Sequence, residues 1–288
     1  MYKNKIVITF GLLMMIFSSE AISQDRLSLK PAKADREKIE EVKWNTKKVA
    51  VGMEVKTASI SIFDSPQEIF ILDIDTAAAK LNYYVGMADS MEKTSVLAKE
   101  QGAIAAINGS FFRNHDEPLG QSRHLIMIEG EILAHTESEE FSNRATGAVL
   151  VRGNQVDITD WSKEKEMRIE GQADHVLTSG PLLMDDGKKV DLTGTPFVLK
   201  RHPRSVIAFV DGHLLFMVIG GRSEKAAGMT LEEVQFFCLA LGCSDILNLD
   251  GGGSSTLYVK GYDEDEIVNV PTDGSERAVK GIFYITTE

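Results

Sequence analysis

From residue 49 onward the sequence alternates short apolar runs with turn residues, and this pattern restricts the fold more than any other feature. Strand-like runs lie at residues 69–74, 124–128 and 148–152, and hairpin-type turns lie at residues 152–155, 186–187 and 211–212. The turns contain Gly or Asn, which tolerate the positive φ angles of tight hairpins. Clear helical patterns occur only at residues 94–101 and 231–241. We therefore predict an α+β fold with a mixed, largely antiparallel sheet and a few packed helices.

The composition indicates a globular protein and argues against nucleic acid as a partner. Of 288 residues 43% are hydrophobic, and the formal charge is 31 − 43 = −12. Such a chain is not built to neutralise nucleic-acid phosphates or to lie on an anionic membrane, although a small positive pocket is allowed. Cys238 and Cys243 match neither a zinc-ribbon spacing nor a redox CxxC, so they are free or form a local disulfide. The histidines have no metal-binding spacing, and we expect no metal ion.

The N-terminus has the pattern of a secretory signal peptide. Lys3 and Lys5 precede an apolar run at residues 6–17, and small residues follow at 21–23. The run is shorter than the roughly 20 residues that a membrane-spanning helix needs. We therefore predict a signal peptide over residues 1–23, a charged leader or peripheral helix over 24–48, and the main domain over 49–288. The protein is then secreted or periplasmic, with no integral membrane segment after removal of the signal.

Two distant segments repeat one pattern. In each, a predicted helix ends at a glycine (Gly102 or Gly242), a buried strand follows, and the strand leads into a polar residue, glycine and serine. Glycine after the last helical turn supplies a left-handed cap, and uninterrupted apolar strands belong in the interior of a sheet. The polar residues at the two strand ends are Asn108 and Asp250. Because ligands bind at the ends of such strands, we predict that the two ends converge on one pocket.

Three consecutive glycines, Gly251, Gly252 and Gly253, follow Asp250. Such a run loses much backbone entropy on ordering and contributes no side-chain packing, so it is a poor structural filler. It allows a ligand to approach bare backbone N–H groups, a geometry that suits phosphate or sugar oxygens. The alternative is a tight turn or bulge between two strands.

Five motifs occur in the order and spacing of one family: AINGSFF (106–112), SGPLL (179–183), RHPRS (201–205), GMTLEE (228–233) and NLDGGGSST (248–256). Over roughly residues 80–285 the chain resembles the phosphodiester glycosidase family, whose domain is similar to that of the mannose-6-phosphate uncovering enzyme. The resemblance implies a catalytic domain that hydrolyses the C1–O bond of a sugar-1-phosphodiester, such as an N-acetylglucosamine-1-phospho-sugar, without an organic cofactor. The partner is then a sugar-phosphate or glycan substrate.

Three alternatives remain at this stage. The first is a phosphodiesterase that cuts the P–O bond. The second is a cell-wall or exopolysaccharide-processing enzyme with a different glycosyl donor. The third is a non-catalytic glycan-binding module that keeps the pocket. A serine-nucleophile hydrolase is disfavoured because the chain contains no G-x-S-x-G elbow.

Cleavage at C1 requires a carboxylate near C1, because the transition state resembles an oxocarbenium ion. Asp250 is the first candidate, as nucleophile or as the base that activates water; an Asx-type cap of its own turn is the alternative. Glu233 is the second candidate, as general acid or base. However, Thr230 and Glu233 also have the spacing of a capping box, which would explain Glu233 without chemistry.

The phosphate requires cationic or N–H donors. Arg204 and Arg222 are the candidates, because a guanidinium binds phosphate oxygens in a bidentate manner. His202 could also donate a hydrogen bond to the phosphate, although a position in a surface turn explains this residue equally well. For Arg222 the alternative is a position in a solvated loop. The further substrate-binding candidates are Asn108 as an orienting amide, Ser110 beside it, the N–H groups of Gly251, Gly252 and Gly253, and the hydroxyls of Ser254 and Ser255.

Overall fold

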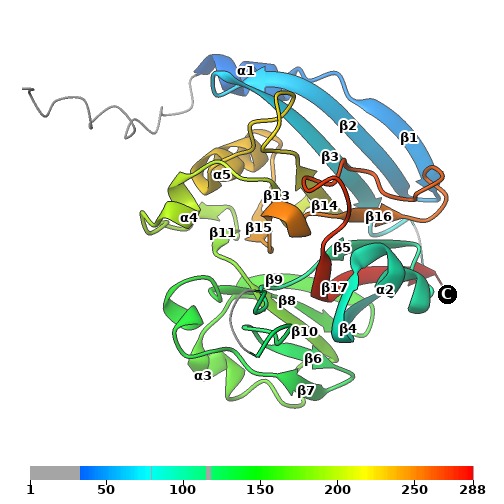
Figure 1. The fold of residues 1–288 in the computed structure, drawn as a ribbon, viewed down its shortest axis with the longest axis vertical. Helices are drawn as coiled ribbons and strands as arrows, with labels where there is room; N and C mark the ends of the chain where they lie inside the picture. The colour runs from blue at the N-terminus through cyan, green and yellow to red at the C-terminus, as the bar shows by residue number, and fades with distance from the viewer. Residues whose placement is uncertain (1–32, 79, 115–117, 288) are drawn as a thin grey trace, which may run out of the picture. The chain divides into compact units, whose positions relative to one another are not determined.

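A computed structural model describes residues 33–78, 80–114 and 118–287. They belong to one compact unit, residues 31–288, and within the described ranges they form three sheets and five helices (Figure 1). The predicted signal peptide at residues 1–23 lies outside the described residues. In the described residues, no helix combines the length and apolarity that a membrane-spanning helix needs.

The largest sheet has eight strands. In spatial order they are β1 (Asn45–Ala50), β2 (Met53–Ile62), β3 (Ser65–Asp75), β14 (His213–Ile219), β13 (Arg204–Val210), β15 (Asp245–Asn248), β11 (Leu182–Asp185) and β12 (Lys188–Lys189). Strand β3 alternates buried with more exposed residues, as its apolar periodicity predicts. The predicted turns at 186–187 and 211–212 join β11 to β12 and β13 to β14.

Two smaller sheets complete the fold. The five-stranded sheet has the order β7 (Glu131–Ala134), β6 (Ile126–Ile128), β10 (His175–Ser179), β8 (Gly147–Arg152) and β9 (Gln155–Asp160). The four-stranded sheet has the order β16 (Leu257–Val259), β5 (Ala105–Asn108), β17 (Ala278–Thr287) and β4 (Leu81–Lys93). Neighbouring strands pair antiparallel throughout the three described sheets. The predicted α+β class with a largely antiparallel sheet is confirmed.

The main core lies where the three sheets face one another. Phe216 of the eight-stranded sheet, Phe283 of the four-stranded sheet and Val149 of the five-stranded sheet are fully buried in one apolar cluster. The rings of Phe216 and Phe283 meet edge to face at 5.6 Å. Because the sheets share this core, loops from different sheets are held in fixed relation to one another.

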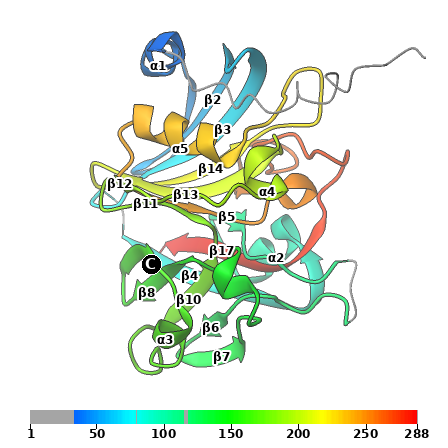
Figure 2. The ribbon, with the colours of Figure 1, turned by 90° about the vertical axis from the view of Figure 1, so that its left-hand side faces the viewer.

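The helices are α1 (Lys33–Glu40), α2 (Thr94–Glu100), α3 (Lys163–Glu166), α4 (Pro196–Leu199) and α5 (Leu231–Ala240). Helix α5 lies along one face of the eight-stranded sheet (Figure 2), and its Phe237 shares an apolar cluster with Ile39 of α1. The two predicted helices are α2 and α5, and both precede a glycine with positive φ: 67° at Gly102 and 88° at Gly242.

The described part of the charged segment, residues 33–48, takes part in the same compact unit. It contributes α1 and most of edge strand β1, and the side chain of Ile39 is completely buried. The short helices α3 and α4 have four residues each, too few to produce a recognisable helical period in the sequence. Cys238 and Cys243 are buried free thiols.

Candidate active site

The two strand ends of the repeated pattern meet, as the sequence predicts. Asn108 ends β5 and Asp250 follows β15, so they come from different sheets. The Asn108 Nδ2 donates to the Asp250 carbonyl oxygen at 2.6 Å, and the Asp250 N–H donates to the Gly109 carbonyl oxygen at 3.0 Å. The Asn108 Oδ1 accepts from the Ser205 Oγ at 2.7 Å and from the Thr256 N–H at 3.1 Å. Asn108 is thus a fully buried crosslink beneath the site, with both amide atoms engaged.

A cavity of about 220 Å³ opens beside Asp250. Its wall combines phenylalanine rings with a concentration of positive charge. The lining residues are Phe111, Phe112, Asn114, Arg144, Phe197, His202, Pro203, Arg204, Arg222, Asp250, Gly251, Gly252 and Arg277. Among the described lining residues there are therefore four arginines and one carboxylate, and Arg144 and Arg277 pair with Glu140 and Asp273, which do not line the cavity. In a protein with a net charge of −12, such a cavity is a candidate site for an anionic ligand.

Arg204 is completely buried at the start of β13. Its Nε donates to the Met229 carbonyl at 2.9 Å, and its Nη2 donates to the carbonyls of Phe197 and Lys200 at 2.8 and 2.9 Å. Its Nη1 has no hydrogen-bond partner in the described structure. Burial lowers the pKa of Arg204 to about 9, so it is charged at neutral pH. The Glu233 carboxylate favours the charged form of Arg204 and Arg222 opposes it, so an anion in the cavity would further offset the cost of burying this charge.

Arg222 and His202 extend this positive wall. Arg222 is exposed, with a φ of 59°, and its Nη2 donates to the His202 Nδ1 at 3.2 Å. Burial, with the positive charges of Arg204, Arg222 and Lys200, lowers the pKa of His202, so the ring is neutral at pH 7. Because Nδ1 accepts, the ring proton is on Nε2, which is then a donor. Neither Arg204 nor Arg222 has a carboxylate partner within 4 Å among the described residues.

Asp250 is partly exposed to solvent and lines the cavity. Burial raises the pKa of Asp250 to about 6, although the Ser254 side chain and the charges of Arg144 and Arg277 act in the opposite direction. Such a carboxyl group is largely ionised at pH 7 but more basic than an ordinary aspartate. It therefore has the properties of a nucleophile or general base near neutral pH.

The three glycines admit close neighbours. A Cβ on Gly252, which has a φ of 65°, would lie 3.1 Å from the Arg222 Nη2. A Cβ on Gly253 would collide with the Asp273 carboxylate and the Arg277 guanidinium. The Gly252 N–H, which we expected to be free for phosphate, donates to the Pro203 carbonyl at 2.9 Å. The run therefore allows Arg222 and Arg277 to pack against the backbone of the glycine turn, and Gly253 is not among the residues that line the cavity.

The sequence reasoning missed Arg144 and Arg277. The Arg144 Nε and Nη2 donate to the Glu140 carboxylate at 3.0 and 2.6 Å, and its guanidinium lies 4.6 Å from the centre of the Phe111 ring. Burial alone would raise the pKa of Glu140, but hydrogen bonds with His124 and Arg144 lower it to about 2. The Arg277 Nη2 lies 2.7 Å from the Asp273 Oδ2.

A sequence signal for Arg144 exists in the SGPLL motif. A Cβ on Gly180 would collide with the Arg144 carbonyl oxygen, so this glycine allows the backbone of Arg144 to pack against the motif. A glycine in such a motif is a sign of close backbone approach, but it does not name the partner. Arg277 lies in none of the five motifs, and we find no sequence signal for it.

Several predicted residues lie away from the cavity wall. The Glu233 carboxylate completes the capping box by accepting from the Thr230 N–H at 2.9 Å, and it pairs with Arg201 at 2.5 Å. This corrects the expectation of an acid or base role, because its oxygens are engaged and it does not line the cavity. The Ser110 Oγ donates to the Thr178 carbonyl. Ser254 and Ser255 are buried behind the glycine turn and do not line the cavity.

Comparisons with known proteins agree with this arrangement. The phosphodiester glycosidase family model matches residues 101–286. The prophage-derived protein YomE of Bacillus subtilis is 28% identical over 225 residues, covering 76% of this chain and 33% of YomE. This chain therefore spans about a third of the length of that curated relative.

Two solved structures share the fold. The catalytic domain of zebrafish N-acetylglucosamine-1-phosphodiester alpha-N-acetylglucosaminidase has a TM-score of 0.64 at 16% identity, covering 85% of this chain and 88% of that domain. A hypothetical protein from Synechocystis has a TM-score of 0.64 at 15% identity, covering 85% of this chain and 64% of its own. At such sequence identities the structural similarity establishes only the fold, whereas the match to the family model establishes family membership. The chain belongs to the phosphodiester glycosidase family.

Proposed function

We propose that the protein hydrolyses the bond between C1 of a sugar and the phosphodiester attached to it, outside the cytoplasm. One observation carries the proposal: the buried, charged Arg204 lines the cavity that also holds Asp250, and its Nη1 has no hydrogen-bond partner in the described structure. A phosphate oxygen would supply the missing acceptor and the missing negative charge. The signal-peptide pattern in residues 1–23 supports the location.

The cavity provides what C1–O cleavage needs. Arg204, Arg222 and the Nε2 of neutral His202 bind the phosphate oxygens, and Asp250 acts at C1 as nucleophile or base. The leaving group is a phosphate monoester, whose second pKa is about 6, so it departs without a strong general acid. This fits a cavity in which Asp250 is the one carboxylate among the described lining residues.

The remaining residues have supporting roles in this proposal. Asn108 is a positioning residue, because it holds the Asp250 backbone from below through its hydrogen bond to the carbonyl. Arg144 holds a fixed orientation between Glu140 and the Phe111 ring and places a further positive charge near Asp250. Phe111, Phe112 and Phe197 form an apolar wall for the sugar or for the group beyond the phosphate.

Isotope labelling tests which bond breaks. When an N-acetylglucosamine-1-phosphodiester is hydrolysed in oxygen-18 water, we expect the label on the sugar, because water attacks C1 directly or through an Asp250 intermediate. Mass spectrometry of both products measures this. Label on the phosphate would instead establish P–O cleavage and reject the proposal. Binding without turnover across a panel of sugar-1-phosphodiesters would indicate a glycan-binding module.

The pH dependence tests the state of Asp250. We expect kcat/KM to fall about tenfold per pH unit below pH about 6, because protonated Asp250 cannot attack or accept a proton. In the complex the negative phosphodiester disfavours ionisation of Asp250, so the corresponding fall in kcat should occur at a higher pH. Both profiles come from initial rates between pH 4 and 9. A rate that rises as the pH falls below 6 would show that protonated Asp250 is the active form.

A further inference from the structure

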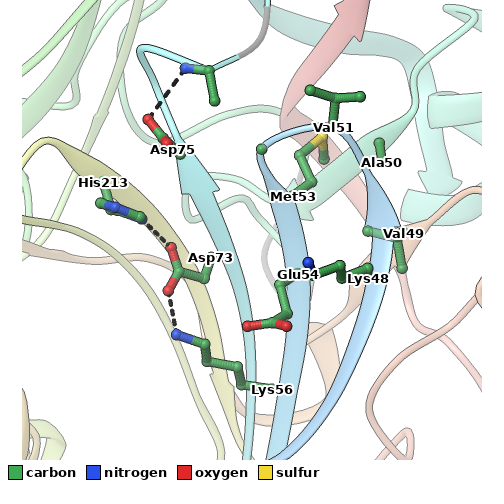
Figure 3. A pocket seen from close by; sticks show the side chains of 12 residues that line it. Lys48, Val49, Ala50, Val51, Met53, Glu54, Lys56, Asp73, Asp75 and His213 are labelled. Atoms are coloured by element: carbon green, nitrogen blue, oxygen red, sulfur yellow. Dashed lines mark hydrogen bonds and ion pairs between the residues drawn. The ribbon is translucent and has the colours of Figure 1, made fainter.

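A second and larger cavity, of about 750 Å³, lies at the other end of the eight-stranded sheet. Strands β1, β2, β3 and β14 form its wall (Figure 3). On β14, His213 lines this cavity, whereas Ile219 at the opposite end pairs with Arg204. Six residues of strand separate the two ends, which corresponds to about 20 Å. The second cavity is therefore distinct from the site at Asp250.

A hydrogen-bonded group of polar residues from three strands lies in this cavity. The Asp73 Oδ1 lies 2.6 Å from the His213 Nδ1, and the Asp73 Oδ2 lies 2.5 Å from the Lys56 Nζ (Figure 3). The Asp73 side chain is only 14% exposed. Because a carboxylate oxygen accepts, the His213 Nδ1 donates, and its Nε2 stays available to another partner. The three side chains therefore hold one another in fixed positions at the cavity wall.

Glu54 is the unusual member of the cavity. It lies directly opposite Asp73 in the pairing of β2 with β3, and its side chain is partly buried. Like charges in directly opposed positions destabilise a sheet. Lys48 lies opposite Glu54 on β1, but within the described residues no ion pair within 4 Å or hydrogen bond engages the Glu54 carboxylate. Glu54 thus keeps two unused acceptor oxygens at a position that costs stability, a combination expected of a binding residue.

The balance of charges identifies the class of ligand. Three carboxylates (Glu54, Asp73 and Asp75), two ammonium groups (Lys48 and Lys56) and the imidazole of His213 line the cavity. Because the opposite charges on this wall nearly cancel, neither an anion nor a cation is strongly attracted to it. The arginine-lined cavity at Asp250 differs in this respect. Neighbouring donors and acceptors match hydroxyl groups, each of which both donates and accepts. Aliphatic side chains at the tip of the β1–β2 hairpin, including Val51, which is 75% exposed, supply apolar contact.

We propose that this second cavity binds a neutral saccharide, with Glu54 and Asp73 accepting hydrogen bonds from its hydroxyl groups. The proposal concerns a site separate from Asp250, and it stands whether or not hydrolysis at Asp250 is correct.

NMR titration of the 15N-labelled protein tests the proposal. The probes are chitobiose, cellobiose and mannobiose at millimolar concentrations, with inorganic phosphate as the anionic probe. We expect at least one disaccharide to shift the amide signals of residues 48–56, 73–75 and 213. Phosphate should shift the signals around residues 204, 222 and 252 instead. If the proposed function at Asp250 is wrong, the phosphate titration or the turnover assay will show it. If the saccharide proposal is wrong, the disaccharide titrations will show it.

The matched variants are Glu54→Gln and Asp186→Asn. Glu54→Gln should weaken the disaccharide about tenfold or more, because it removes a charged hydrogen-bond acceptor. It should leave the melting temperature unchanged or higher, because it also removes the opposed like charges. Asp186→Asn, at a side chain that is 94% exposed, should leave binding unchanged.

Three outcomes would overturn the proposal. The first is the absence of shifts in the β1–β2 hairpin with all three disaccharides. The second is disaccharide shifts confined to the residues around Asp250. The third is unchanged disaccharide affinity in Glu54→Gln.

Discussion

Asp250→Asn should reduce the turnover of a sugar-1-phosphodiester by about 10³-fold or more, because a general base contributes 10²- to 10⁴-fold and a nucleophile is harder to replace. The substitution keeps the shape of the side chain but removes the charge that attacks C1 or accepts the proton of water. The Asp250 contacts with Asn108 and Gly109 use its backbone atoms and persist in the variant. Steady-state kinetics with a purified sugar-1-phosphodiester measures the loss.

The stability of the same variant separates a chemical role from a structural one. In the folded protein burial raises the pKa of Asp250 from 3.8 to about 6, so its ionised form opposes folding at pH 7. The melting temperature of Asp250→Asn should therefore be equal to or higher than that of the parent at pH 7. Asp186→Asn, at a side chain that is 94% exposed, is the control and should change neither property. A lower melting temperature with retained turnover would make Asp250 a turn-capping residue.

The parts of the fold that depend on local sequence were predictable. The helix cap at Thr230, the positive-φ glycines after α2 and α5, and the hairpin turns each require particular residues within a few positions, so the sequence reveals them. The meeting of Asn108 with Asp250 was also predictable, because both follow strands of the same pattern. The division into three sheets was not, because strand pairing depends on contacts between residues far apart in the chain.

The site was predictable in position but less so in the role of each residue. Asn108 was expected to touch substrate, yet it is a fully buried crosslink whose amide nitrogen and oxygen both bond to neighbouring protein groups. The capping-box alternative for Glu233 is the one that the hydrogen bonds support. Arg144 and Arg277 come from loops outside the motifs, and only tertiary packing brings them to Asp250.

Replacing Arg204 or Arg222 should lower kcat/KM for substrates that carry a phosphate group, and it should hardly change kcat/KM for substrates without one. Arg222→Ala should lower kcat/KM for a sugar-1-phosphodiester about 10²-fold, because a charge-assisted donor to the developing phosphate monoester is lost. Arg204→Lys should cost at least as much, since an ammonium keeps the charge but not the planar fork that donates to three carbonyls and leaves Nη1 as a further donor. Because Arg222 is exposed, Arg222→Ala should fold normally. It therefore provides the test if Arg204→Lys is unstable.

The decisive control for these arginines is a substrate without phosphate. A nitrophenyl glycoside of the same sugar presents C1 to Asp250 but gives Arg204 and Arg222 no anion to bind, so its low kcat/KM should be almost unchanged in Arg222→Ala. Inorganic phosphate should inhibit the parent and lose about tenfold or more in potency against the variant. Phosphate is a closer match than a diester for this wall, because its second ionisation, near neutral pH, gives it a second negative charge to set against the guanidinium groups of Arg204 and Arg222. Equal losses on both substrates would mean that Arg222 shapes the cavity rather than binding phosphate.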